Sequence, residues 1–275
     1  MTTKADEFYI GWQDEAPPGV SRRVRNFILV VCVILPSLGA LLVLNQAGFA
    51  TSSFELGRPS EVEGILVTKP ASFLAVNRGK DAEGQPVFQN ILLVGRGKFG
   101  VGQMLAEFEK KRGLLDGKMV KMRGYLIYHD GKSLLEIEAL LDVKEPDPEM
   151  QSPPSFMPLG KGAFIGEIAD PKCLFGVMKP GHGKPHRSCA ARCIAGGIPP
   201  VLKTVAANGN TQYFLLADEE NGAFSEEVLP FIGYPVQVCG ELRQLGNWLV
   251  LFKDRKKGLS RLPGNLNIKV PMCGE

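Results

Sequence analysis

Hydrophobic residues form one unbroken stretch near the start of the chain. From Asn26 to Phe54 there is no charged residue, and the stretch from Phe27 to Leu44 is almost wholly apolar. A helix of that length can cross the roughly 30 Å hydrocarbon core of a bilayer. The pattern predicts a transmembrane helix over 27–48, preceded by an N-terminal tail over 1–26.

Three arginines, Arg22, Arg23 and Arg25, lie just before this stretch. Because basic flanks stay on the cytoplasmic side, we expect the tail in the cytoplasm and the rest in the periplasm or outside the cell. This predicts a single-pass protein of the inner (cytoplasmic) membrane. A cleaved export signal is the alternative, since Gly48 and Ala50 fit a small-residue cleavage site, although the apolar run exceeds the usual ~7 to 15 residues.

After the anchor, apolar and polar residues alternate in a way that predicts β-strands. Residues 59–141 and 163–254 each contain alternating segments, a short helical pattern, and two final segments joined by a glycine-containing turn. Between them, residues 142–162 hold five prolines and no periodic pattern, which predicts a stiff linker. Residues 255–275 are predicted to form a basic C-terminal tail.

The two alternating regions are similar to each other. In "GKMVKMRGYL" and "GYPVQVCGEL", Gly117 aligns with Gly233 and Gly124 aligns with Gly240. A helix before the last two of five strands is typical of the OB-type barrel, in which such a glycine lies where a strand bends. The predicted fold is mainly β: one N-terminal transmembrane helix and two tandem OB-like small β-barrels, each with a short helix.

The most unusual chemistry is concentrated between Cys173 and Pro200. This stretch holds three of the six cysteines and two of the three histidines, and it follows the first strand of the second barrel as an insertion. Pro185 near its start and Gly196–Gly197 at its end predict a short helix between them.

The spacing of His186, Cys189 and Cys193 places them within about 60° of one another on that helix. Cys173 is expected nearby because the loop must return to the barrel, and His182 in "GHG" could replace His186 or cover an open position. Thiolates with imidazole suit a copper, zinc or iron centre. These five residues are therefore the candidate metal ligands.

Disulfide bonds with a purely structural role are the alternative for the cysteines of an exported chain. Cys173 joined to Cys189 or Cys193 would close the loop, and Cys239 with Cys273 could form a second bridge. The five cysteines outside the membrane are an odd number, so at least one thiol must be free, metal-bound or joined to another chain.

Thiol-based redox chemistry is the third interpretation of the same residues. It would need a cation that stabilises a thiolate, and Arg187 or Arg192 could provide one. The segments "DPKC" and "CAARC", over roughly residues 163–216, resemble a part of uncharacterised bacterial membrane-anchored exported proteins, in which a strand ending in Asp-x-x-Cys leads into a Cys-x3-Cys helix. That resemblance implies no known activity.

The remaining motifs give weaker indications of function. Gly95, Gly97 and Gly100 form a G-x-G-x-x-G, but the unit is too short for a dinucleotide-binding fold, so a surface turn is predicted and a phosphate site is the alternative. His129 beside Asp130 is expected to be exposed at a hairpin tip. A net charge of +3, without basic runs interleaved with aromatic residues, argues against nucleic acid as a partner.

Location, anchor and soft ligands together predict a non-catalytic accessory or structural subunit of a membrane redox or assembly system. Its expected partners are the lipid bilayer and other membrane protein subunits. A metal-delivery or electron-transfer protein and a thiol oxidoreductase are the alternatives, and no catalytic residue is assigned.

Overall fold

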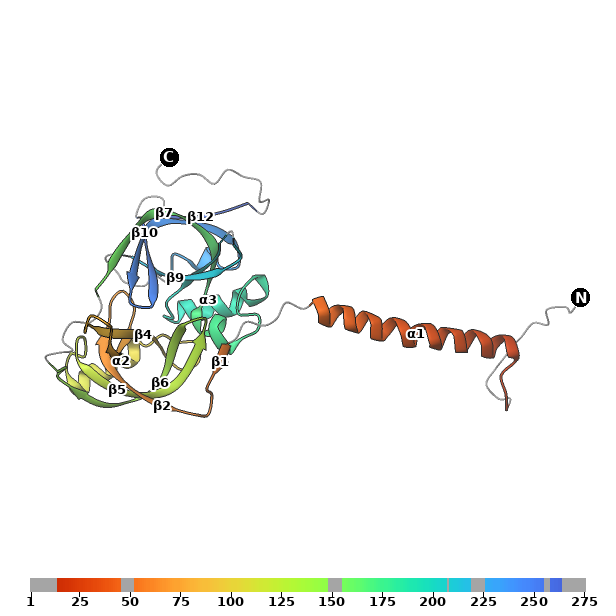
Figure 1. Ribbon diagram of the computed structural model, residues 1–275, viewed down its shortest axis with the longest axis horizontal. Helices are drawn as coiled ribbons and strands as arrows, with labels where there is room; N and C mark the ends of the chain where they lie inside the picture. The colour runs from red at the N-terminus through yellow and green to blue at the C-terminus, as the bar shows by residue number, and fades with distance from the viewer. Residues whose placement is uncertain are drawn as a thin grey trace, which may run out of the picture. The chain divides into compact units, whose positions relative to one another are not determined.

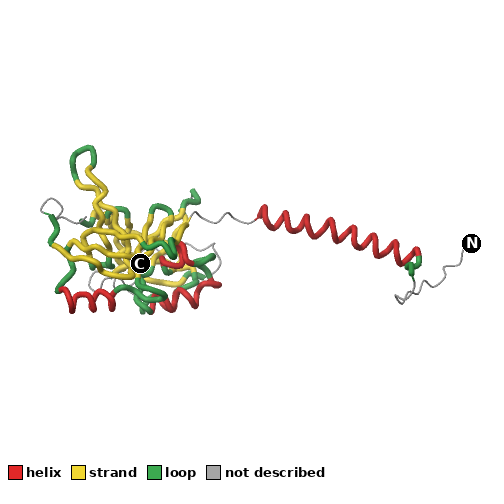
Figure 2. Tube along the Cα trace, turned by 90° about the horizontal axis from the view of Figure 1, so that it is seen from below, coloured by secondary structure: helices red, strands yellow, loops and turns green. Residues whose placement is uncertain are grey.

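The computed structural model describes residues 14–45, 52–147, 155–206, 208–218, 226–254 and 258–263, apart from the side chain of Val177. The chain divides into two compact units, Met1–Ala50 and Thr51–Glu275. The second unit is mainly β, as the alternation of apolar and polar residues predicted. In Figure 2 its strands fill the interior and its helical segments lie on the outside.

The first unit contains a single described helix, α1 (Pro18–Asn45). At 1.5 Å per residue its 28 residues span about 42 Å, and the helix is long and apolar enough to cross a membrane. It begins nine residues before the predicted start, because Pro18 is suited to a first turn and no further proline follows before Phe27. Pro36 lies within it, as expected of a membrane helix. The predicted end, 46–48, lies outside the described residues.

The first half of the second unit forms a closed ring of five strands. β2, β3 and β4 follow one another in antiparallel pairs, α2 comes next, and the β5–β6 hairpin closes the ring, with β6 parallel to β4 and β5 antiparallel to β2. The short β1 extends the sheet at β5. The bounds are β1 (Ser52–Phe54), β2 (Ser60–Val67), β3 (Phe73–Lys80), β4 (Pro86–Val94), α2 (Gly102–Arg112), β5 (Met119–His129) and β6 (Lys132–Lys144).

The second half forms another closed ring with the same pairing order. β7, β8 and β9 are antiparallel neighbours, and the β10–β11 hairpin closes the ring, with β11 parallel to β9 and β10 antiparallel to β7. The short η4 precedes β10, and β12 extends the sheet at β10. The bounds are β7 (Met157–Ala169), β8 (Val201–Val205), β9 (Thr211–Ala217), η4 (Leu229–Phe231), β10 (Pro235–Leu245), β11 (Trp248–Lys253) and β12 (Leu259–Arg261).

The strands reach into both segments that were predicted to be irregular. β6 continues to Lys144 and β7 starts at Met157, so strands occupy both ends of the 142–162 segment, whose residues 148–154 lie outside the described part. β12 lies within the predicted tail, because Leu259 pairs with Val238 of β10 and packs against the core.

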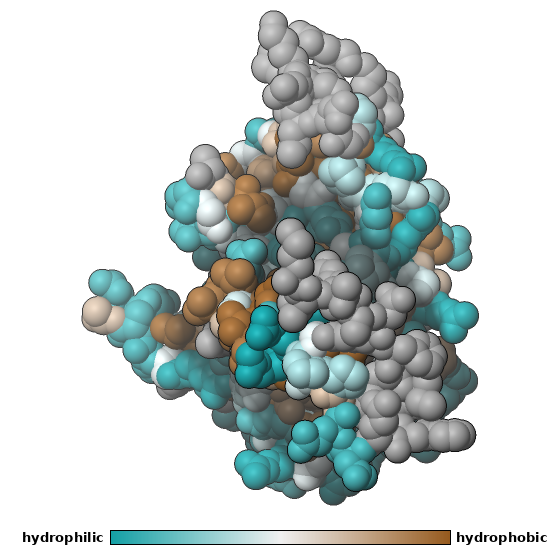
Figure 3. Space-filling model, turned by 90° about the vertical axis from the view of Figure 1, so that its right-hand side faces the viewer, coloured by the Kyte–Doolittle hydropathy of each residue, from teal (hydrophilic) through white to brown (hydrophobic). Residues whose placement is uncertain are grey.

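The two barrels share one apolar core where they meet (Figure 1). Trp248 of the second barrel is fully buried and lies 5.7 Å from the ring of Phe73 in the first barrel. Its indole Nε1 donates to the carbonyl oxygen of Asn90, in β4, at 2.9 Å. In Figure 3 hydrophilic residues cover much of the described surface, with smaller hydrophobic patches among them.

His129 belongs to the same contact and is not exposed, contrary to the expectation from its place at a hairpin tip. Only 6% of it is accessible, its ring stacks on Phe175 at 5.3 Å, and its Nε2 is 2.7 Å from the hydroxyl of Tyr213. Burial and Asp130 raise the pKa of Tyr213 to about 12. The second barrel covers this hairpin tip, which the first barrel's sequence alone cannot reveal.

The glycine-rich turn of the first barrel is also an inter-barrel contact. The backbone N–H of Gly100 donates to the carbonyl of Gly196, just after α3 (Arg187–Ala195), at 2.9 Å. A Cβ on Gly100 would lie 2.0 Å from the carbonyl oxygen of Gly197, and a Cβ on Gly196 would lie 2.1 Å from that of Lys98. These glycines serve close backbone packing between the barrels.

We predict that Gly100→Ala destabilises the protein by roughly 1–3 kcal/mol, because the new methyl group would overlap backbone that cannot move freely. Gly102→Ala is the matched control, since a Cβ there meets nothing within 4 Å and alanine favours the helix that starts at this residue. Thermal unfolding of the full chain in detergent compares them. Equal melting temperatures for both variants would contradict the proposed contact.

Candidate metal and thiol site

The site begins where β7 ends. Asp170 is fully buried, and its carboxylate Oδ1 accepts a hydrogen bond from the backbone N–H of Cys173 at 2.8 Å. This fixes the first turn of η2 (Cys173–Val177), a single wide turn in which the N–H of Met178 donates to the carbonyl of Cys173. Such turns are frequent at functional sites. Cys173 is thereby held at the inner end of the insertion.

The predicted helix of the insertion is present as η3 (Lys184–His186) followed by α3, which stops before Gly196 as expected. Cys193 lies on the buried face of α3 and is 1% accessible. Cys189, one turn earlier, is partly exposed, and His186 at the start of the helix is buried. The site therefore has a buried side and one partly open side, at Cys189.

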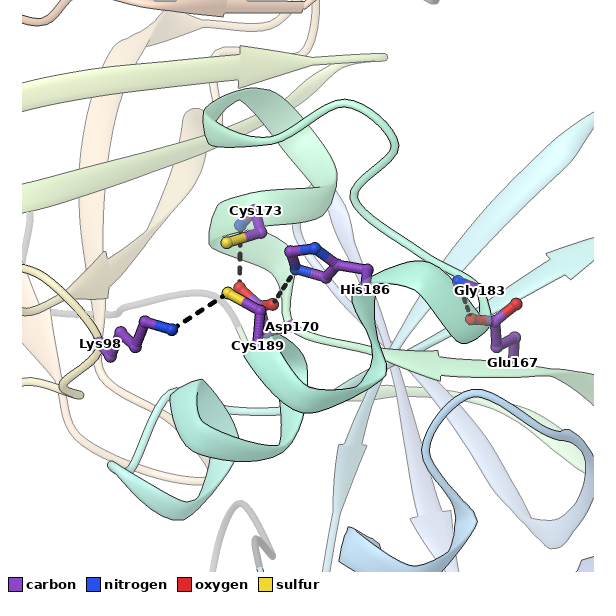
Figure 4. Close-up of polar contacts among 7 residues, drawn as sticks. All are labelled: Lys98, Glu167, Asp170, Cys173, Gly183, His186 and Cys189. Carbon is purple, nitrogen blue, oxygen red and sulfur yellow. Dashed lines mark hydrogen bonds and ion pairs between the residues drawn. The ribbon is translucent and has the colours of Figure 1, made fainter.

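Four of the five predicted ligands lie in two groups that share Cys173, and Figure 4 shows the first of these groups. A sulfur of Cys173, a ring nitrogen of His186 and the sulfur of Cys189 lie within 4.8 Å of one another. Cys173 and Cys193, with an oxygen of Asp170, form a second such group. Two thiolates on a tetrahedral metal with bonds of about 2.3 Å lie about 3.8 Å apart, which fits within the 4.8 Å spacing of each group.

Asp170 also orients the histidine. Its Oδ2 lies 3.3 Å from Nε2 of His186, and both side chains are almost inaccessible. Metal-bound histidines commonly donate their second ring N–H to a carboxylate, which fixes the tautomer and the ring orientation. With Nε2 held by Asp170, Nδ1 of His186 is the ring nitrogen that would bind a metal, and Asp170 would then play that supporting role.

The two buried thiols, Cys173 and Cys193, are hydrogen-bonded to each other. The hydrogen bond to Cys193, followed by burial, raises the pKa of the Cys173 thiol. The same hydrogen bond lowers the pKa of Cys193, which accepts it. The first proton to leave this pair therefore comes from Cys193, and a metal that binds Cys173 must replace its proton.

The cation nearest to a thiol comes from the first barrel. Nζ of Lys98 donates to Sγ of Cys189 at 3.3 Å. Of the two arginines that the sequence suggested, Arg187 donates instead to the hydroxyl of Tyr234 at 2.8 Å and stacks on its ring. Cys189 is thus the thiol that receives a hydrogen bond from a cationic side chain.

His182 does not join the thiols. Its Nε2 lies 3.0 Å from Nζ of Lys203, and the backbone N–H that follows it, of Gly183, donates to the carboxylate of Glu167. Burial and then Lys203 lower the pKa of His182. The loop turns this side chain toward β7 and β8, so the sequence suggestion that it could replace His186 finds no support in the geometry.

Cys173, Cys189 and Cys193 are free thiols, so the predicted disulfide within the insertion is absent from the structure. Cys239 is disulfide-bonded. Cys273, the partner that the sequence suggested for it, lies outside the described residues.

No protein-family model matches the chain. No curated protein matches it. The interpretation of the site therefore rests on its own geometry.

Sequence reasoning missed Asp170, Lys98 and Lys172. Asp170 had a local signal, because an aspartate directly before a helical turn commonly caps it by accepting a hydrogen bond from the backbone N–H three residues on. Lys172 binds the carbonyls of Gly95 and Gly97 and pairs with Glu136, and Lys98 precedes Cys189 by 91 residues. No local pattern indicates contacts of that separation.

We predict that Cys189 reacts first with a maleimide in the native, metal-free protein, because it is the only partly exposed thiol of the three and the ammonium group of Lys98 donates to its sulfur. A Cys32→Ser background removes the thiol of α1. Mass spectrometry of labelled peptides after short exposures gives the order. Labelling of Cys173 before Cys189 would contradict the arrangement.

His182 gives a pH dependence with a defined sign. Its pKa in the folded state lies below the value of about 6.5 expected in the unfolded chain. The stability from neutral His182 is therefore present above pH ~6.5 and is lost as pH falls toward the folded-state pKa. When the pH is lowered from 7.5 to 5, the melting temperature of the natural chain should fall further than that of His182→Gln. An equal fall in both would refute this prediction.

Proposed function

We propose that this protein is a membrane-anchored accessory protein that holds one soft transition-metal ion through Cys173, His186, Cys189 and Cys193. The observation that carries the proposal is that two groups of ligand atoms share the free thiol of Cys173: one adds His186 and Cys189, the other adds Asp170 and Cys193, and the atoms within each group lie within 4.8 Å of one another. Sulfur-rich sites with one histidine suit zinc, Cu(I) or iron, and a zinc site of this kind has the ligand set Cys3His.

The enclosure of the site supports storage or transfer of a metal more than turnover of a substrate. Cys173, Cys193 and His186 are all at most 5% accessible, and Cys189 is the partly open ligand. A structural or carrier site is closed by protein ligands, whereas a catalytic one keeps a coordination position for substrate. The proposed role is that of an accessory or structural subunit of a membrane redox or assembly system. The alternative with the same metal site is a metal-delivery or electron-transfer protein.

The proposed setting is the outer side of the cytoplasmic membrane. α1 supplies a single span, and the arginines before it favour a cytoplasmic N-terminus. The disulfide-bonded state of Cys239 supports an oxidising compartment for the barrels. The partners in this proposal are the bilayer and other membrane protein subunits.

We also propose that the two rings are OB-like barrels that arose by duplication. Both have the same pairing order, with a parallel pair between the third and last strands and a helical turn before the final hairpin. The aligned glycines play the same part: a Cβ on Gly124 would lie 2.2 Å from the carbonyl oxygen of Glu136, and one on Gly240 would lie 2.1 Å from that of Phe252. The Cys/His insertion then distinguishes the second copy from the first.

A second candidate function is thiol–disulfide exchange, favoured by the contact between Lys98 and Cys189. The Cys189 thiolate would attack a disulfide in a partner protein, and Cys173 would then displace the mixed disulfide. The partner is reduced to two thiols while Cys173 and Cys189 lose two electrons and form a disulfide.

Metal analysis tests the first proposal. The full chain, purified in detergent without chelator or reductant, should contain about one equivalent of zinc, copper or iron per chain by elemental analysis. Cys189→Ser and His186→Gln should lose most of it, because each removes a ligand, whereas His182→Gln should keep it as the matched control.

The two functions give different results in this experiment. A natural chain without metal that cycles between two reduced thiols and one disulfide in the presence of a dithiol would replace the metal proposal with thiol exchange. Equal loss of metal in His182→Gln and His186→Gln would show that the ligand set is wrong.

A further inference from the structure

Lys98 approaches the site from the other barrel. It lies in the turn between β4 and α2 of the first barrel, and its Nζ is 3.3 Å from Sγ of Cys189 on α3 (Figure 4). The two residues are 91 positions apart. Cys189 is also the one thiol of the site that is partly exposed, so the ammonium group lies at the open side.

The backbone of Lys98 is held in place although its side chain is exposed. The N–H of Gly95 donates to the carbonyl of Phe99 at 2.9 Å, which closes the turn, and the N–H of Gly100 donates to Gly196. Lys172, from the insertion itself, donates to the carbonyls of Gly95 and Gly97 at 2.9 and 2.7 Å.

The turn that carries Lys98 is held by Lys172 on one side and by the residues just after α3 on the other. Lys172 forms a buried ion pair with Glu136 of β6 at 2.5 Å, so its ammonium group is fixed and charge-balanced. A Cβ on Gly196 would lie 2.1 Å from the carbonyl oxygen of Lys98, which shows how closely α3 meets the turn. The position of Lys98 beside the thiol is therefore set by packed backbone.

The metal-bound site would carry negative charge, which the ammonium group of Lys98 can balance. A divalent metal with three thiolates and a neutral imidazole carries one net negative charge, and the buried carboxylate of Asp170 adds another. Negative charge that is removed from water is costly unless a cation or hydrogen-bond donor balances it. The ammonium group of Lys98, which donates to the sulfur of Cys189, is both a cation and a hydrogen-bond donor.

We propose that Lys98 is a positioning residue of the metal site, contributed by the first barrel, which donates to the sulfur of Cys189 and balances the charge of the loaded site. This inference rests on the proposed metal-binding function. It gives the glycine-rich turn a purpose, because that turn carries the lysine to a helix of the other barrel.

Cobalt(II) titration of the full chain in detergent tests the inference, with the sulfur-to-cobalt absorption band as the readout. Loss of a supporting group of this kind usually weakens metal binding by about 10–100-fold. Lys98→Met should show that loss together with a shift of the band to longer wavelength, since a thiolate without its hydrogen bond gives up electron density more easily. Lys98→Arg should restore most of the affinity.

Arg96→Met is the matched control, because it removes an exposed cation from the same turn without touching the contact to Cys189. It should bind cobalt as the natural chain does. If Lys98→Met does not fold by circular dichroism, Lys98→Gln is compared with Lys98→Arg, and equal affinity and band position in those two would overturn the inference.

The outcomes separate the two proposals. A natural chain that shows no sulfur-to-cobalt band would refute the metal-binding function, and the inference with it. A natural chain that binds cobalt while Lys98→Met has the same affinity and the same band would leave the function intact and reject the role of Lys98.

Discussion

Burial of apolar side chains between the two barrels is the interaction on which the rest of this structure depends. Trp248 is fully buried there, against Phe73 of the first barrel and Phe175 of the insertion. A buried tryptophan removes roughly 150–250 Å² from water, which at about 25 cal/mol per Å² amounts to ~4–6 kcal/mol. Because one core crosses the junction, the barrels form one compact unit, Thr51–Glu275.

The Cys/His site depends on that shared core. Cys173 and Cys193 belong to the same apolar cluster as Trp248, so the wall behind the two thiols is built by residues of both barrels. Such a wall excludes water, strengthens every charge interaction at the site and keeps the buried thiols from reacting with solvent oxidants. The insertion alone, without the first barrel beside it, would leave its thiols more exposed.

The glycine-rich turn shows how a motif takes its meaning from its surroundings. Gly95, Gly97 and Gly100 have the spacing of a phosphate-binding loop, yet here the absence of side chains lets the turn meet Gly196 backbone to backbone. A buried lysine, Lys172, occupies the carbonyls that face the insertion. The small size of these glycines therefore allows close packing between the barrels. Whether such a turn binds phosphate or packs against protein depends on the residues that lie opposite it.

Local patterns in the sequence determined the apolar helix α1, the strands, the helices α2 and α3, and the placing of Cys189 and Cys193 on α3 with His186 just before it, because these features depend on periodicity and on residues a few positions apart. Only the tertiary structure decided that His182 turns away to Lys203, that His129 is buried, and that Asp170 and Lys98 lie beside the ligands. Those contacts arise from two barrels packing together across many tens of residues, where no short-range pattern constrains which side chains meet.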